Sequence, residues 1–330
     1  MNPIRADLRG FHLLKSLIPP LSLTMGPGVS SLLAFMSTGQ GFVTRKFLAR
    51  MRERTHGMVF QTLEEAVKTF EVEEMIRAAL PPDPEYKMHN VNVYGQASNH
   101  YGLHPTVGGR HLTVEEKFEP MFSDRVQRGY LALLRNLAGH DPTIPGAPRI
   151  SWLAAHKWVV DAKINGFGPG SLGALQFANN LTLLGVASPP SPVEMAQWIS
   201  DHQDKGAFRG LQVLGFQLEQ KNASPSAVRV AFLCVYAWLD NFLTTDDKLV
   251  LDFGPIFVEQ LLCKVGRWCR RLNDHAAQKT AKVALSQLAD KAFEGARWTS
   301  GENLTQFNKW PFPPCTKYKP AVFRKIIESR

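Results

Sequence analysis

Apolar residues recur every three or four positions along most of the chain, which is the spacing of one face of an α-helix. Several such stretches begin with residues that favour a helix N-terminus. Thr62–Glu65 and Thr113–Glu116 have the spacing of a capping box. Ser191–Glu194 combines an N-cap serine, a proline at the first helical position and a capping glutamate, and Ser224-Pro225 begins in the same way. Alternating patterns typical of strands are scarce, so the pattern predicts an all-α, or mainly helical, protein.

One of the expected helices differs from the rest because it has no polar face. Residues 228–243 are apolar nearly all round, which is typical of a buried central helix, and Cys234 within them is expected to be a small core residue. The other helices are expected over residues 62–80, 113–134, 151–163, 171–184, 191–200, 256–272 and 276–292.

Two stretches lack a helical period. Residues 85–112 are expected to form a loop region that could hold one short strand. His140–Pro148 contains three prolines and a glycine, which are typical of a linker. The sequence therefore predicts an N-terminal mixed or helical subdomain, 1–148, and a helical domain with a C-terminal tail, 149–330.

Charge and cysteine usage narrow the choice of partners. The 330-residue chain has a net charge of +9 and a pI of about 9.4, which favours polyanions such as nucleic acid. Its four cysteines form no CxxC pair and no Cys/His spacing of a zinc site, so a reducing compartment and no metal site are expected. The apolar run at 13–21 is broken by Pro19-Pro20 and is too short for a membrane span or a signal peptide. We therefore expect a soluble, cytoplasmic protein without a membrane partner.

A glycine-rich segment between two expected helices is the clearest candidate for a ligand-binding site. Glycines in residues 163–174 permit positive φ and leave backbone N–H groups uncovered, and the following helix adds its positive dipole end. Together these features form a nest for a phosphate oxygen. The spacing matches neither a GxGxxG dinucleotide loop nor a Walker loop, and a plain tight turn is the alternative. The residues expected to bind DNA are Lys163, Gly166, Gly168, Gly170 and Ser171.

Three segments together resemble a known family. They are Gly166–Leu181, Lys205–Leu211 and Glu302–Trp310, in that order. The order is similar to that in the alpha-glutamyl/putrescinyl thymine pyrophosphorylase family, DNA-glycosylase-like amino acid:DNA transferases of bacteriophage DNA hypermodification. The resemblance implies a helix-hairpin-helix, DNA-glycosylase-like architecture for roughly 150–315. The chain departs from the family pattern at Asn180 and Asn308, where the family has aspartate, and at Gln306, where it has glutamate.

The resemblance also implies a reaction. An amino acid or polyamine would be transferred to 5-pyrophosphoryloxymethyl-uracil in phage DNA, and pyrophosphate would leave; the modified DNA then resists host restriction. The implied partners are DNA with a modified thymine base and a small amine. No cofactor is identified, although Mg²⁺ could assist the leaving group. The residues expected to take part in catalysis are Asn180, Arg209 and Lys309, and those expected to line the pyrophosphate and substrate pocket are Lys205, Gly206, Gly210 and Trp310.

The identity of the proton acceptor and the class of protein are left open. Attack requires an unprotonated amine, and His202, Asp204 or Asn180 could take or orient its proton. A base-excision glycosylase is a second hypothesis, but residues 185–192 supply neither the aspartate nor the lysine that such chemistry usually uses. A non-catalytic DNA-binding protein and a viral structural or nucleocapsid protein are further alternatives.

Overall fold

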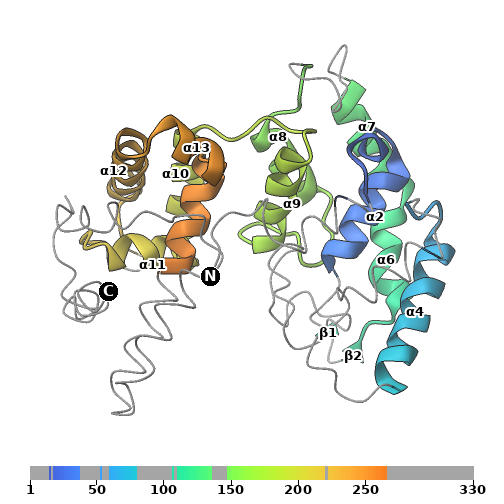
Figure 1. The fold of residues 1–330 in the computed structure, drawn as a ribbon. Helices are drawn as coiled ribbons and strands as arrows, with labels where there is room; N and C mark the ends of the chain where they lie inside the picture. The colour runs from blue at the N-terminus through green and yellow to red at the C-terminus, as the bar shows by residue number, and fades with distance from the viewer. Residues whose placement is uncertain are drawn as a thin grey trace. The chain divides into compact units, whose positions relative to one another are not determined.

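The computed structural model describes residues 15, 18–37, 53, 59–79, 106–107, 110–135, 147–219 and 222–265, with the backbone alone for 73–79, 106–107 and 110–111. These residues fall into two compact units, one within Ala6–Pro189 and one within Pro190–Arg330. We call them the N-terminal and C-terminal units (Figure 1). Each is described by itself.

The described part of the chain is mainly helical, as predicted. The N-terminal unit contains η1 (Pro20–Thr24), α2 (Gly26–Ser37), α4 (Leu63–Ala79), β1 (Thr106–Val107), β2 (Arg110–His111), α6 (Val114–Phe122), α7 (Asp124–Arg135), α8 (Trp152–Asp161) and α9 (Leu172–Leu183). The C-terminal unit contains α10 (Pro192–Asp201), α11 (Gly206–Val213), α12 (Pro225–Phe242), α13 (Thr245–Leu251) and a helical stretch over residues 255–265. The two short strands pair as an antiparallel hairpin inside the expected loop region.

The predicted helix starts are confirmed, because each depends on a local hydrogen bond. Thr113 and Ser191 form complete capping boxes with Glu116 and Glu194. The Ser224 side chain caps α12 by accepting a bond from the N–H of Ala227. At α4, Thr62 Oγ1 accepts from the N–H of Glu65 at 3.1 Å.

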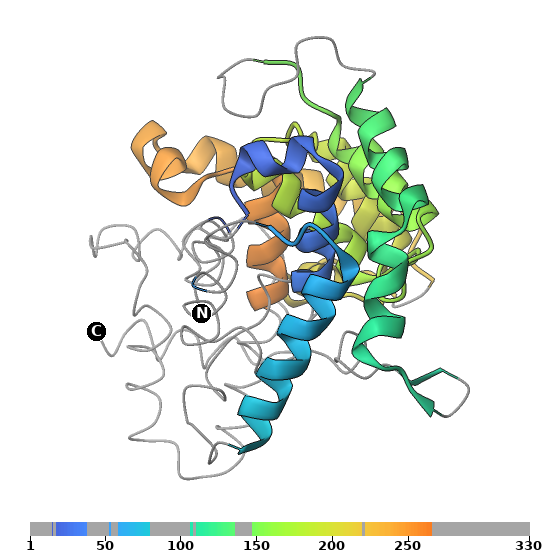
Figure 2. The same cartoon turned by 90° about the vertical axis from the view of Figure 1, so that its right-hand side faces the viewer.

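The core of the N-terminal unit forms where α2 meets α6 and α7 (Figure 2). Phe35 on α2, Phe70 on α4 and Phe118 on α6 are fully or almost fully buried and contact one another edge to face. Lys117 Nζ donates to the carbonyl of Ser37 at 2.6 Å, which places a cation at the C-terminal end of α2 where the helix dipole favours it. The Tyr130 hydroxyl donates to Leu23 O at 2.9 Å, and burial raises the pKa of this phenol far above its ordinary value.

The prediction that residues 228–243 form a buried central helix is wrong. Only Val228, Ala231, Phe232 and Val235 of α12 are buried, whereas Val230 is 58% exposed. Cys234 is also exposed, so its assignment to the core is corrected. The physical reason is that a helix is buried all round only where neighbours cover every side, and the exposure of Val230 and Cys234 shows that one side of α12 is not covered.

The units also divide at a different place from the expected boundary after residue 148. The division falls between Pro189 and Pro190. The helices α8 and α9 therefore belong to the N-terminal unit, in which α8 packs on α7 and α9 packs on α2. None of the described helices combines the length and apolar character that crossing a bilayer requires.

Candidate nucleic-acid interface

The glycine segment forms a tight connection between α8 and α9, which pack on each other. Lys163 has a φ of 55°, Gly166 a φ of 88° and Gly170 a φ of 71°. Positive φ is costly for a residue with a Cβ, so the two glycines occupy the positions that require them, and Lys163 is held there by its surroundings. At Gly168 a Cβ would meet no atom within 4 Å, so this glycine leaves open space above the hairpin.

Two apolar side chains fix the hairpin to the N-terminal unit. Ile164 and Phe167 are 2% and 0% exposed, respectively. The Phe167 N–H donates to Ile164 O at 3.0 Å, and the Ser171 N–H donates to Gly168 O at the same distance. Ser171 Oγ then accepts from the N–H of Ala174 and caps α9, as expected for a helix that begins at Leu172. The hairpin therefore has a defined shape before any ligand binds.

The outer side of the hairpin presents backbone donors. Among the residues that the structure describes, the N–H groups of Gly168, Gly170 and Leu172 donate to no acceptor within the chain. They flank the N-terminus of α9, where the helix dipole is positive. This arrangement suits an anion that accepts several hydrogen bonds at once, such as a phosphate group.

Two cations lie at the start of the hairpin. Lys163 is exposed and forms no ion pair within the described residues. Arg125 of α7 donates from Nη2 to Ala162 O, the carbonyl of the C-cap residue of α8. The charge of Lys157, by contrast, is balanced by Asp161 at 2.7 Å. Lys163 is therefore the cation at the hairpin that is best placed to meet a ligand.

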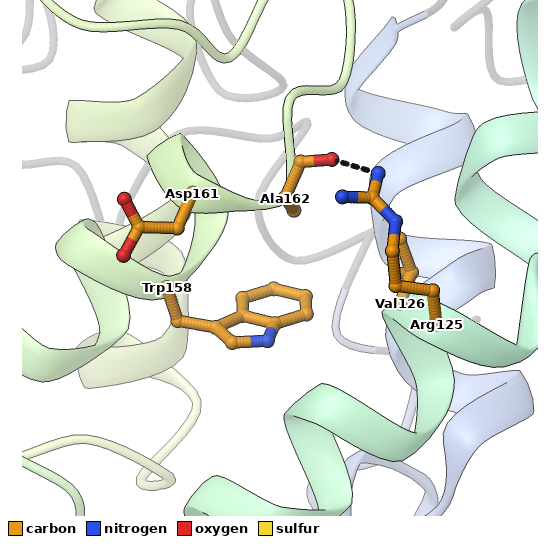
Figure 3. Close-up of a pocket in the computed structure, with 5 residues that line it drawn as sticks. All are labelled: Arg125, Val126, Trp158, Asp161 and Ala162. Atoms are coloured by element: carbon orange, nitrogen blue, oxygen red, sulfur yellow. Dashed lines mark hydrogen bonds between the residues drawn. The ribbon is translucent and has the colours of Figure 1, made fainter.

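A small pocket of about 130 Å³ lies where α7 meets the end of α8, next to the start of the hairpin (Figure 3). The indole of Trp158 forms one wall, and the guanidinium of Arg125 lies across from it on the α7 side (Figure 3). The carboxylate of Asp161 points away from Arg125 in this view. Trp158 is half-buried, whereas Trp152 on the same helix is 2% exposed.

Asn180 lies inside the N-terminal unit and not at its surface. It is fully buried on α9, and its Nδ2 donates to Met36 Sδ of α2 at 3.4 Å. The neighbouring Asn179 is also fully buried and accepts from Trp152 Nε1 at 2.9 Å. Both amides join α9 to adjacent helices, so Asn180 would meet a substrate only if this core opened.

The structure gives Gly206 and Gly210 a packing role in α11. They are four residues apart and face the helical residues 255–265. A Cβ at Gly206 would crowd Cys263, and a Cβ at Gly210 would overlap the backbone carbonyl of Leu262. The sequence analysis assigns these two glycines to a phosphate pocket. In the structure, their four-residue spacing also puts both on one side of α11 and lets two helices approach closely.

Polar side chains surround the start of the same helix. Lys205 is its N-cap residue but forms no capping hydrogen bond with its side chain, which instead pairs with Asp204 at 2.7 Å. Arg209 lies one turn further and is half-buried. Burial alone would raise the pKa of Asp204, but the hydrogen bond and charge of Lys205, helped by His202, outweigh burial and hold this pKa below its usual value.

His202 occupies a defined orientation in this group. Its ring stacks on Trp198 with centroids 4.3 Å apart, and Nδ1 lies 2.6 Å from the carbonyl oxygen of Trp198. A carbonyl can only accept, so Nδ1 carries the proton and Nε2 of the neutral ring keeps a lone pair.

The predicted site residues are distributed over both units. The hairpin residues and Asn180 belong to the N-terminal unit, and Lys205, Gly206, Arg209 and Gly210 belong to the C-terminal unit. Lys309 and Trp310 lie outside the described residues, and their roles stay predictions. Within the described part of the chain, no group of three or more His, Cys, Asp or Glu side chains is arranged to hold a metal ion.

Comparison with family models, curated proteins and solved structures finds no match to this chain. The resemblance to the thymine pyrophosphorylase family therefore stays a prediction.

Proposed function

We propose that the protein binds the phosphate backbone of DNA through the hairpin between α8 and α9, as a helix-hairpin-helix element. The observation that carries this proposal is the set of three N–H groups, at Gly168, Gly170 and Leu172, in a hairpin that begins at the exposed Lys163. A phosphate has several acceptor oxygens and a negative charge, so it matches both features. The net charge of +9 adds a long-range attraction for a polyanion.

This mode of binding is expected to be independent of base sequence. Backbone donors and a lysine contact phosphate oxygens, which are the same at every nucleotide. The two buried anchors, Ile164 and Phe167, hold the donors in place, so little ordering is needed when the ligand binds.

Replacing Lys163 by alanine should weaken DNA binding to a similar degree for all sequences. Loss of one phosphate contact should also lower the slope of log affinity against log salt by about 1. Fluorescence anisotropy with labelled duplexes at several salt concentrations measures both quantities. Gly168→Ala places a methyl group in the open space above the hairpin and should reduce affinity without lowering the melting temperature.

The matched control for the lysine is Lys68→Ala. Lys68 is exposed on α4 in the same unit, so the change in net charge is identical while the hairpin is untouched. Equal effects of Lys163→Ala and Lys68→Ala would mean that the hairpin makes no specific contact and that only total charge matters.

We further propose that the C-terminal unit carries out the transfer of an amine to 5-pyrophosphoryloxymethyl-uracil. The amine nitrogen forms a bond to the C5 methylene carbon, the bond from that carbon to pyrophosphate oxygen breaks, and the amine loses one proton. The supporting observation is the start of α11, where Lys205, which also pairs with Asp204, and Arg209 lie one turn apart on the same side of the helix. Two cations so spaced suit the polyanionic leaving group, and arginine can bind two of its oxygens at once.

Of the three candidate proton acceptors, His202 is the best supported. Its Nε2 keeps a lone pair because Nδ1 bonds to the carbonyl of Trp198. Asp204 is a weaker base because its pKa is depressed by Lys205, and Asn180 is buried in the other unit.

The transfer proposal is tested with DNA that carries the pyrophosphorylated base. Incubation with a panel of amino acids and polyamines should yield a new nucleoside, detected by mass spectrometry after digestion. Arg209→Ala should lower the rate about 100-fold or more, since it removes a donor that stabilises developing charge. Arg128→Ala, which changes an exposed arginine on α7, is the control and should leave the rate unchanged.

Two results would contradict this proposal. Absence of any new nucleoside across the panel would reject the transfer reaction, and retained DNA binding would then favour a non-catalytic DNA-binding protein. An unchanged rate for Arg209→Ala would remove this residue from the site.

A further inference from the structure

The outward face of α12 is an exposed apolar strip. We call it the outer stripe and define it as Ala227, Val230, Cys234, Ala237 and Asn241, all of which are exposed. At 3.6 residues per turn, these positions fall within about one quarter of the helix circumference. The one polar member, Asn241, donates its Nδ2 to the carbonyl of Ala237 at 2.8 Å and so satisfies its donor on its own helix.

The remaining residues of α12 show that this exposure is not spread evenly round the helix. Val228, Ala231, Phe232 and Val235 lie on the opposite face, and α12 packs there on α10 and α11. Val230 is 58% exposed although it stands within a mainly apolar helix. Apolar side chains that lie together on a surface mark a candidate interaction site.

We propose that the outer stripe is the interface of a homodimer, in which α12 packs antiparallel against α12 of a second copy. In a two-fold interface the same surface is used by both copies, so it must complement itself. The helix runs from Pro225 to Phe242, and Cys234 stands next to its midpoint on the exposed side. A two-fold axis at Cys234 therefore lets the two helices overlap along their whole length.

The charges that flank the stripe fit the same arrangement. Arg229 stands five residues before Cys234 and Asp240 stands six residues after it, and both lie on the same flank of the helix. Antiparallel pairing about Cys234 brings Arg229 of one copy to the level of Asp240 of the other. In a parallel two-fold pairing this flank of the two copies would lie on opposite sides of the interface, so Arg229 and Asp240 would not meet. Arg229 forms no ion pair among the described residues, whereas Asp240 also pairs with Lys248 of α13 at 2.8 Å.

The sizes of the side chains allow a close approach. Ala227, Cys234 and Ala237 are small, so two helices can pack about 8–10 Å apart between axes. With Cα atoms about 2.3 Å from each axis, the two Cys234 Cα atoms would then lie about 3.4–5.4 Å apart. This range overlaps the separation that a disulfide requires. An oxidant should therefore join the two copies at this position.

The test uses the full-length protein and sedimentation velocity over a concentration series. The wild-type chain should form a dimer, and Val230→Asp should raise its dissociation constant about 100-fold or more, because an unpaired carboxylate enters the interface. The matched control is Val193→Asp. Val193 lies on α10 in the same unit and is 56% exposed, against 58% for Val230, so the same substitution is made outside the stripe.

Cross-linking then locates the axis. Mild oxidation should yield a covalent dimer that is lost in Cys234→Ser and kept in Cys315→Ser. A monomer at every concentration would overturn the proposal. So would equal effects of Val230→Asp and Val193→Asp, or a dimer whose cross-link survives Cys234→Ser. A monomer whose Cys234 is also protected from a maleimide would show that the stripe is covered by another part of the same chain. These experiments measure neither DNA binding nor the formation of a modified nucleoside. Their outcome is therefore independent of the proposed function.

Discussion

Gly210→Ala is expected to lower the free energy of unfolding of the C-terminal unit by about 2–3 kcal/mol. Alanine would ordinarily stabilise a helix relative to glycine by about 1 kcal/mol. At this position, however, its Cβ would overlap the backbone carbonyl of Leu262, which cannot rotate away as a side chain can. The helices α11 and 255–265 would have to separate, and the close packing between them would be lost. Urea unfolding, followed by circular dichroism, measures the change.

Gly254→Ala is the control for this prediction. Gly254 is in the same unit, and a Cβ there would meet no atom within 4 Å. Its substitution should leave stability unchanged or slightly raised, because alanine restricts the unfolded chain. If Gly210→Ala proved as stable as Gly254→Ala, the close approach of the two helices in the structure would be incorrect.

Phe167→Ala is expected to cost about 3–5 kcal/mol, which is typical for removal of a buried aromatic side chain. Phe167 is fully buried and stands between two glycines, where it holds the hairpin to the N-terminal unit. Loss of this anchor should also weaken DNA binding, because the N–H groups of Gly168 and Gly170 would no longer be held in one arrangement. Calorimetry and anisotropy on the same sample measure both effects.

Pro169→Ala is the control for Phe167→Ala. Pro169 is exposed and lies two residues from Phe167. Its change should therefore cost little stability and little affinity. Strong loss of stability in Phe167→Ala without loss of DNA binding would place the phosphate contact elsewhere on the protein.

The features that the sequence predicts well are those that depend on neighbouring residues. The capping boxes at Thr113 and Ser191 form because donor and acceptor are three residues apart, whatever surrounds the helix. The sequence indicates that the glycines of this segment permit positive φ, and Gly166 and Gly170 adopt it, because the lack of a Cβ is a property of the residue itself.

The features that were missed depend on residues that are distant in the chain. Cys234 was placed in the core because its segment is apolar, but no pattern within α12 tells which of its faces has a neighbour. Gly206 and Gly210 were assigned to a phosphate pocket, and only the approach of residues 255–265 reveals their packing role. Arg125 was not singled out at all, because its bond to Ala162 joins positions 37 residues apart.

The donors of the hairpin are main-chain groups, and this has a consequence for how such a sequence can change over evolutionary time. Phosphate binding by backbone N–H groups does not depend on most of the surrounding side chains. It requires only that the positive-φ glycines Gly166 and Gly170 and the buried Phe167 are kept. Drift at exposed positions such as Asn165 and Pro169 would then be nearly neutral. Two homologous chains that keep this hairpin could therefore bind a phosphate in the same way even when the rest of their sequences no longer shows detectable similarity.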